Sequence, residues 1–244
     1  MKSYGYLADV YDKFMADVDY KMWAQYLHGI LSENGAERLL ETACGTGNVT
    51  FELAKYGYDI TAADSSVEML SIAKSKNAVQ SAGVRFVRQD MRSLEAGRKF
   101  DAVLSACDGA NYLCAEGLQS FLSSAYAALK KSGVLLFDIS SERKLKKTLD
   151  GNSFFDEDND TVCIWKNRFD ENEKALYMDV TIFKKQGDMY ERFDETHTQY
   201  AHSADFVLAS AKEAGFAQTH VYDCFTRRKP DSSSQRLQFV CFKI

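Results

Sequence analysis

The stretch that decides the fold is Arg38-Leu39-Leu40-Glu41-Thr42-Ala43-Cys44-Gly45-Thr46-Gly47-Asn48. Its leucines suit a parallel strand that is covered on both faces. Gly45 and Gly47 let the backbone turn sharply and approach a ligand closely, because neither carries a Cβ. We expect a helix to follow over residues 48–56. A strand, a Gly-x-Gly turn and a helix together offer backbone N–H groups to a cofactor.

Two carboxylates follow this turn at places that a nucleoside cofactor would need. A short strand at residues 58–63 ends in Asp64, where a carboxylate accepts hydrogen bonds from ribose hydroxyls. A third strand, at residues 84–88, is followed by Asp90, which is placed to accept from an adenine amino group. The sequence therefore predicts a nucleoside site across three neighbouring strand ends.

With a fourth strand at Phe100–Leu104 and a fifth, with its approach, at Leu129–Asp138, these motifs resemble class I S-adenosylmethionine-dependent methyltransferases. Within that class the chain looks most similar to small bacterial enzymes related to sugar-amine N-methyltransferases. The resemblance implies an α/β fold with a Rossmann-like, doubly wound, seven-stranded sheet whose last strand is antiparallel. It also implies S-adenosyl-L-methionine as the cofactor, and an N or O atom of a small molecule as the methyl acceptor.

The resemblance assigns roles to individual residues. Glu41 and the glycine turn would hold the methionine portion, Asp64 the ribose, and Asp90 with the Met91 backbone the adenine. The full expected cofactor set is Tyr11, Glu41, Ala43, Gly45, Thr46, Gly47, Asp64, Ser65, Met69, Asp90, Met91 and Cys107. Ser65 is also expected to cap the helix that follows, with Glu68 completing a capping box.

A dinucleotide-binding dehydrogenase is the rival interpretation of the glycine turn. Its fingerprint requires a third glycine three residues after the second, and Thr50 occupies that position here. That scheme also has no counterpart for Asp90-Met91. The combination of motifs therefore favours the methyltransferase.

Composition limits the remaining possibilities. The 244 residues are 45% hydrophobic and 27% charged, which is ordinary for a globular domain with at most one elaboration. No run approaches the ~20 apolar residues of a membrane span, and the N-terminus shows no signal peptide. Six cysteines occur without a Cys-x-x-Cys pair, which indicates reduced thiols and favours a cytoplasmic protein. Both a monomer and a homodimer remain open.

Nucleic acid and metal ions are disfavoured as partners. The net charge is −5, and the one dense basic run, Arg143-Lys144-Lys146-Lys147, is interpreted as a solvated helix face. Asp156, Asp158 and Asp160 imitate the opening of a calcium loop. Thr161 stands where that loop needs glycine, so we expect no metal site.

Residues 1–36 are predicted to form a helical lid, in two amphipathic helices within residues 4–34. In the resembling family such helices fold over the cofactor, and Tyr11-Asp12 matches a pair common at this position. A phenol ring can face a sulfonium cation favourably, so Tyr11 is a candidate for the reacting centre. Tyr6 is a weaker one.

The loop after the fourth strand is predicted to form a wall of the acceptor pocket, because ligands bind beyond the carboxyl ends of parallel strands. Its candidate substrate residues are Asp108, Asn111 and Tyr112. In the sugar-amine relatives a histidine lies near the place of Tyr112, which makes Tyr112 a catalytic candidate. Asp108 has an alternative role as the cap of a helix expected near residues 116–130.

Residues 141–200 are predicted to form a β-rich insertion over the substrate side, because their side chains alternate with a period of two. Trp165 belongs to this insertion as a further substrate candidate. Alternation also places Phe193, Glu195, His197 and Gln199 on one strand face. The methyltransferase domain itself is assigned to residues 37–140 and 201–244, and ends in a helix capped by Ser203 and two strands at residues 218–225 and 235–242.

Glu195 and His197 are candidates to meet the acceptor, with His197 as a general base whose ordinary pKa of about 6.5 suits neutral pH. The candidate catalytic set is thus His197, Tyr112 and Tyr11. Two other functions remain open at this point: a cofactor-binding regulator without catalysis, and an RNA methyltransferase. The net charge disfavours the second.

Overall fold

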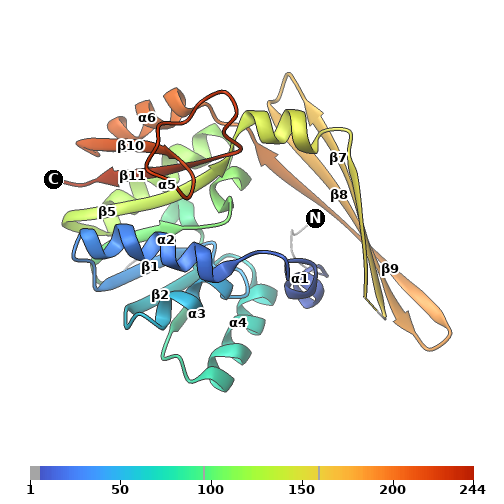
Figure 1. Ribbon diagram of the computed structural model, residues 1–244. Coiled ribbons are helices and arrows are strands. Elements are labelled where there is room, and N and C mark those ends of the chain that lie inside the picture. Colours follow the sequence, from blue (N-terminus) through green and yellow to red (C-terminus); the bar gives the residue numbers. More distant parts are fainter. Residues whose placement is uncertain (1–5, 96, 159) are drawn as a thin grey trace.

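A seven-stranded sheet forms the centre of the protein, and a smaller four-stranded sheet projects from one side of it (Figure 1). The computed structural model describes residues 6–95, 97–158 and 160–244. The strand order of the large sheet is β10-β11-β5-β4-β1-β2-β3. Its strands are β1 (Arg38–Thr42), β2 (Asp59–Asp64), β3 (Arg85–Arg88), β4 (Phe100–Ser105), β5 (Leu129–Ser140), β10 (Gln218–Asp223) and β11 (Arg236–Phe242). β11 runs antiparallel to both β5 and β10, which confirms the predicted reversed last strand.

Helices cover both faces of this sheet, as a doubly wound fold requires. Leu39 packs in one apolar layer with α2 (Tyr20–Glu33), α3 (Asn48–Ala54) and α4 (Val67–Gln80). Its neighbour Leu40 packs in the opposite layer with α5 (Ala115–Ala128) and α6 (Ala204–Glu213). Both leucines are buried because consecutive residues of a strand point to opposite faces. The buried strand predicted from the decisive stretch is thereby confirmed.

The small sheet lies within the predicted insertion. Its strands β6 (Ser153–Asp158), β7 (Thr161–Asp170), β8 (Ala175–Gln186) and β9 (Met189–Tyr200) pair in sequence as antiparallel hairpins. A π-helical turn, η3 (Lys144–Leu149), leads into it from β5. The short helix α1 (Ala8–Phe14) packs its apolar side on the small sheet and also contacts α4 (Figure 1).

The cap of α4 was predicted one residue too early. Ser66, and not Ser65, is the N-cap, and its hydroxyl accepts a hydrogen bond from the Met69 N–H at 3.1 Å. The Asp64 carboxylate binds the Ser66 N–H at 2.8 Å, which keeps Ser65 in the loop. Glu68 contacts the Ser66 hydroxyl at 3.0 Å.

Three other boundaries differ from the prediction. α3 ends at Ala54, before Tyr56. The N-terminal helices are separated by residues 15–19, because the Asp19 carboxylate binds the Met22 N–H and starts α2 there. Cys114 precedes α5, so Asp108 does not cap that helix. Of the predicted helical segment, residues 4 and 5 lie outside the described residues.

Candidate active site

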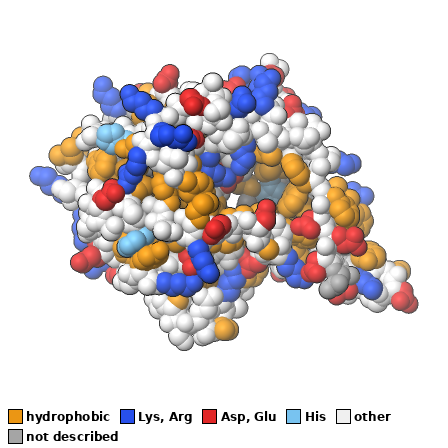
Figure 2. All heavy atoms as spheres, in the orientation of Figure 1, with side chains coloured by type: hydrophobic (Ala, Val, Ile, Leu, Met, Phe, Trp, Pro, Cys, Tyr) orange, Lys and Arg blue, Asp and Glu red, His pale blue; other side chains and the backbone are white. Residues whose placement is uncertain are grey.

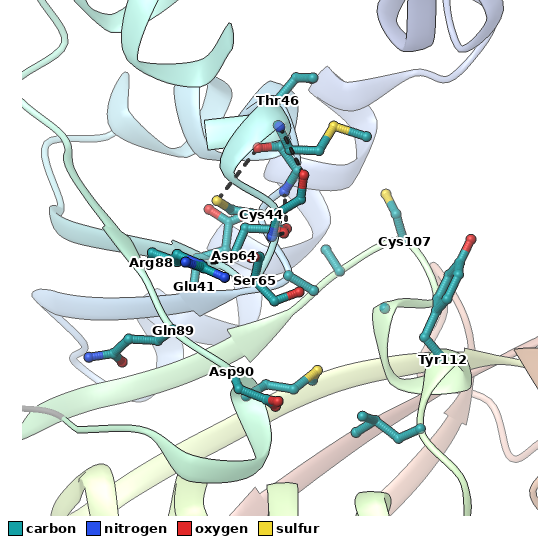
Figure 3. Close-up of a pocket in the computed structure, with 18 of the residues that line it drawn as sticks. Glu41, Cys44, Thr46, Asp64, Ser65, Arg88, Gln89, Asp90, Cys107 and Tyr112 are labelled. Atoms are coloured by element: carbon teal, nitrogen blue, oxygen red, sulfur yellow. Dashed lines mark hydrogen bonds between the residues drawn. The ribbon is translucent and has the colours of Figure 1, made fainter. Parts of the chain in front are cut away.

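A cavity of about 550 Å³ opens where β1, β2, β3 and β4 end (Figure 3). The loops after all four strands line it, as expected for an open parallel sheet. Eleven of the predicted cofactor residues line it: Tyr11, Glu41, Ala43, Gly45, Thr46, Asp64, Ser65, Met69, Asp90, Met91 and Cys107. The tertiary structure thus brings one N-terminal residue together with four separate strand ends.

The glycine turn is shaped by left-handed backbone. Gly45 has φ 56° and Gly47 has φ 83°, a region that side chains other than glycine rarely adopt. A Cβ on Gly47 would also lie 2.8 Å from the Phe51 ring. Gly47 does not line the cavity itself; it lets the chain turn from the loop into α3.

Asp64 holds the turn against the end of β2. One of its carboxylate oxygens accepts a hydrogen bond from the Gly45 N–H at 2.8 Å, and the other accepts from Ser66. Burial raises the pKa of Asp64, although these backbone donors counteract it. Each carboxylate oxygen retains a second lone pair, so the side chain is able to accept ribose hydroxyls as well.

Glu41 lies at the floor of the cavity and is only 2% exposed. Its Oε2 atom has no hydrogen-bond partner among the described residues. Burial raises the pKa of Glu41 to about 7, and the negative charge of Asp64 adds to this effect. A buried carboxylate with an unsatisfied oxygen at the wall of a cavity fits the ammonium group of a methionine cofactor.

Asp90 is more engaged than the sequence indicates. Its carboxylate binds the Arg92 guanidinium with contacts down to 2.5 Å and also accepts from the Arg92 N–H at 2.9 Å. This guanidinium bonding lowers the pKa of Asp90, so the side chain stays ionised. Asp90 begins the short turn η1 (Met91–Ser93), which places Met91 in the cavity wall.

The remaining end of the cavity is aromatic. Tyr11 of α1, Tyr20 of α2, Tyr112 of η2 (Gly109–Tyr112) and Tyr200 of β9 all line it. Burial raises the pKa of Tyr11 well above its ordinary value, with further contributions from Tyr20 and Cys107 nearby. Burial likewise raises the pKa of Tyr20 to about 12. Tyr11 and Tyr20 therefore stay protonated at neutral pH.

Cys107 and Asp108, after β4, both have left-handed backbone, with φ 59° and 56°. Cys107 faces the cavity beside Tyr112 (Figure 3), whereas Asp108 does not line it. There its carboxylate pairs with Arg236 at 3.1 Å and accepts from Gln199 at 3.0 Å. Burial opposes the charge, yet Arg236 and Lys144 hold the pKa of Asp108 below its usual range. Lys144, predicted to be solvated, is half-buried here.

Asn111 and Trp165 do not line the cavity. The Asn111 side chain donates to the carbonyl oxygens of Ser140 and Tyr200, at 3.2 and 2.9 Å, and so fixes the end of β9 beside η2. Trp165 packs against Phe14 of α1, with 6.1 Å between ring centroids. Both positions therefore support the wall without contacting its inner surface.

Glu195 and His197 share one face of β9, as predicted, and that face is buried rather than solvated. They are 3% and 1% exposed, and neither lines the cavity. The Glu195 carboxylate lies 3.2 Å from the His197 ring nitrogen Nε2. The His197 ring meets the Tyr112 ring edge-on, with 6.1 Å between their centroids, and Tyr112 lines the cavity.

Sequence reasoning missed Tyr20, Tyr200 and Arg92 as lining residues. Tyr20 begins α2 and Tyr200 ends β9, so both stand at element ends that face the cavity. An aromatic residue at the end of a helix or strand indicates a cavity lining only when the packing of that helix or strand is known. Arg92 follows Asp90 by two residues, and the turn η1 brings the two residues into contact.

Two negative findings concern the described part of the chain. None of its helices is long and apolar enough to cross a membrane. Within the same residues, no three or more His, Cys, Asp or Glu side chains are arranged to hold a metal ion.

Known proteins share both this sequence and this architecture. Residues 39–133 match a family model described as a methyltransferase domain. The chain is 36% identical over 239 residues to YqeM of Bacillus subtilis (strain 168), a protein named as a methyltransferase. That alignment covers 97% of this chain and 95% of the relative.

Solved structures agree with these matches. An S-adenosylmethionine-dependent methyltransferase from Clostridium acetobutylicum ATCC 824 superposes with a TM-score of 0.84 at 31% identity, over 99% of both chains. The sugar N-methyltransferase KedS8 from Streptoalloteichus sp ATCC 53650 has the same fold, with a TM-score of 0.82 at 20% identity. That match covers 100% of this chain and 95% of KedS8. The chain therefore belongs to the class I S-adenosylmethionine-dependent methyltransferases, and S-adenosyl-L-methionine is its cofactor.

Proposed function

We propose that this enzyme methylates a nitrogen atom of a small-molecule amine. The observation that carries the proposal is the chemistry of the acceptor end, which Tyr11, Tyr20, Tyr112 and Tyr200 line. Among the described residues that line the cavity there is no histidine. The carboxylates that line it come from β1, β2, the start of α4 and the end of β3, which is the cofactor side.

This lining favours an amine over a hydroxyl as acceptor. A hydroxyl is a weak nucleophile and needs a base that removes its proton. Tyr11 and Tyr20 cannot take up that proton at neutral pH, because burial raises the pKa of both side chains and keeps them protonated. A neutral amine brings its own lone pair and needs chiefly to be held about 3 Å from the methyl carbon.

The cofactor supplies an activated methyl group on a sulfonium centre. The chain's own residues orient it: Glu41 and the glycine turn at the methionine end, Asp64 at the ribose, and Asp90 with Met91 at the adenine. Tyrosine ring faces stabilise positive charge, both on the sulfonium and on the ammonium that forms. Tyr11 closes this end from α1 and excludes water, which strengthens these interactions.

The size and charge of the protein support a small acceptor. A cavity of about 550 Å³ falls within the ~300–1,000 Å³ usual for small-molecule sites. The net charge is −5. On the face seen in Figure 2, basic side chains are interspersed with acidic ones. A macromolecular polyanion would favour a continuous basic surface instead.

The proposal is tested with methyl-labelled cofactor and paired acceptors that differ only in an amino or a hydroxyl group, such as amino sugars against their parent sugars and amino acids against hydroxy acids. We expect label in the amine of at least one pair and in none of the hydroxyl partners. Asp64→Ala, which impairs cofactor binding, is the matched control. Label on a hydroxyl oxygen would overturn the proposal. Cofactor binding without product from any small-molecule pool would favour the non-catalytic regulator instead.

A further inference from the structure

Helix α1 has little to hold it in place by itself. It has seven residues, whereas isolated helices shorter than ~12–15 residues are marginal in water. Its N-cap residue is Leu7, which makes no side-chain capping bond. The position of α1, and with it that of Tyr11, must therefore come from contacts with other parts of the chain.

One side of α1 is fixed to the cofactor loop through Asp12. The Asp12 carboxylate pairs with Lys76 of α4 at 2.5 Å. It also accepts hydrogen bonds from the Thr46 hydroxyl at 2.6 Å and the Asn48 amide at 2.9 Å. Although burial opposes its charge, these donors hold the pKa of Asp12 below its usual value.

The other side of α1 rests on the small sheet. Leu7, Val10 and Phe14 pack on a buried apolar surface formed by Cys163, Val180 and Ile182. Lys184 of β8 also pairs with Asp9 of α1 at 2.9 Å. The helix is thus wedged between the cofactor domain and the small sheet.

A single buried carboxylate completes this arrangement. One oxygen of Glu195 accepts hydrogen bonds from the backbone N–H groups of Tyr6 and Leu7, the latter at 3.0 Å. It therefore supplies, from β9, the acceptor that the start of α1 lacks. The other oxygen contacts His197, whose ring lies against Tyr112. Glu195 so connects the lid helix with the opposite wall of the acceptor end.

We propose that Glu195 is a positioning residue that holds α1 on the small sheet and so places Tyr11 opposite Tyr112. A buried polar pair such as Glu195 and His197 is a weak source of stability, since an apolar pair of similar volume often stabilises as well. The Glu195 carboxylate instead contributes directional hydrogen bonds, because it accepts from the two backbone N–H groups of Tyr6 and Leu7. The importance of the Tyr11–Tyr112 placement rests on the proposed function, but the holding of α1 does not.

The test uses the two tryptophans of the chain. In a Trp23→Phe background, Trp165 is the only one left, and it contacts Phe14 of α1. Glu195→Ala in this background is expected to shift the Trp165 emission to the red and to speed tryptic cleavage at Lys13. Release of bound S-adenosylhomocysteine should become at least ~10-fold faster, the factor for one hydrogen bond to a charged group.

Two further variants sharpen the test. Asp194→Ala removes an exposed carboxylate from the opposite face of β9 and should leave all three readouts within about twofold of the background. Glu195→Gln keeps an acceptor oxygen, so its three readouts should lie between those of the background and those of Glu195→Ala. If Glu195→Ala does not fold, the same readouts are measured in Glu195→Gln instead. A role in folding alone would lower the melting temperature and leave emission and cleavage in the folded protein unchanged.

Unchanged emission, cleavage and release in both Glu195 variants would overturn the proposal. Label on a hydroxyl oxygen would contradict the function proposed above, while emission and cleavage would still decide the role of Glu195. The two failures are therefore distinguishable.

Discussion

Replacing Glu41 by glutamine should stabilise the cofactor-free protein at alkaline pH. In the folded protein, burial raises the pKa of this side chain from its ordinary 4.5 to about 7. The native state consequently loses stability relative to the unfolded chain as the pH rises from about 4.5 through 7. This loss amounts to about 3 kcal/mol at pH 8 and to less than ~1 kcal/mol at pH 5. Glutamine carries no charge, so the Glu41→Gln protein avoids this loss of stability.

The assay is thermal unfolding of cofactor-free protein at both pH values. The gain of Glu41→Gln over wild type should be larger at pH 8 by roughly 5–10 °C, given ~2–4 °C per kcal/mol for a chain of this size. Comparing two pH values cancels any pH-independent cost of the substitution. Glu37→Gln, at an exposed position beside the same strand, is the control and should show no such difference. The same gain at both pH values would refute the reasoning.

The same substitution should weaken cofactor binding, because the charge that destabilises the empty site would pair with the methionine ammonium group. At pH 8 the dissociation constant of S-adenosyl-L-methionine should rise at least about tenfold, the scale for a bond to a charged group. At about pH 5.5 wild-type Glu41 is already protonated, so the two proteins should bind alike. Equal affinity of the wild type and Glu41→Gln at pH 8, measured by calorimetry, would show that Glu41 does not bind the cofactor.

Three further outcomes are expected. Asp64→Ala should weaken cofactor binding by about 1.5–3 kcal/mol in calorimetry while circular dichroism stays unchanged, and undiminished affinity would contradict its role at the ribose. Removal of residues 1–18 should abolish turnover and leave a folded sheet domain, and bound cofactor should slow proteolysis near Tyr11 in the intact protein; cleavage at one rate with and without cofactor would argue against a lid. His197→Gln should lower turnover by less than the ~100-fold of a lost general base, because His197 lies behind Tyr112. A larger loss with unchanged cofactor affinity would restore His197 as a base.

The part of the cavity around the glycine turn could be predicted from the sequence because its signals are local. A strand, a turn and a helix follow one another between Arg38 and Ala54, and the left-handed φ of Gly45 and Gly47 is a requirement that the sequence displays directly. Asp64 and Asp90 could be assigned to the cavity lining for the same reason, since each stands at the end of its own strand. Even the error at the α4 cap is local: Asp64 binds the N–H of Ser66, and two adjacent serines compete for one position.

The acceptor half joins segments that are distant in sequence. Tyr11 and Tyr200 come from segments that are far apart in the sequence, and Asp108 turns away from the cavity because Arg236, 128 residues later, pairs with it. The sequence pattern of one segment does not show which charged side chain a distant segment places beside it. Asp108 and Asn111 therefore lie in a loop that lines the cavity, as predicted, but their own side chains do not line it.

Strand β9 shows where the two kinds of information divide. Alternation by itself determined that Glu195 and His197 share a face, because a pleated strand turns successive side chains to opposite sides. Whether that face meets water, substrate or protein was decided only when α1 packed on the small sheet. A carboxylate is stable in such a buried place only with donors nearby, and here the N–H groups of Tyr6 and Leu7 provide them from 188 or more residues away.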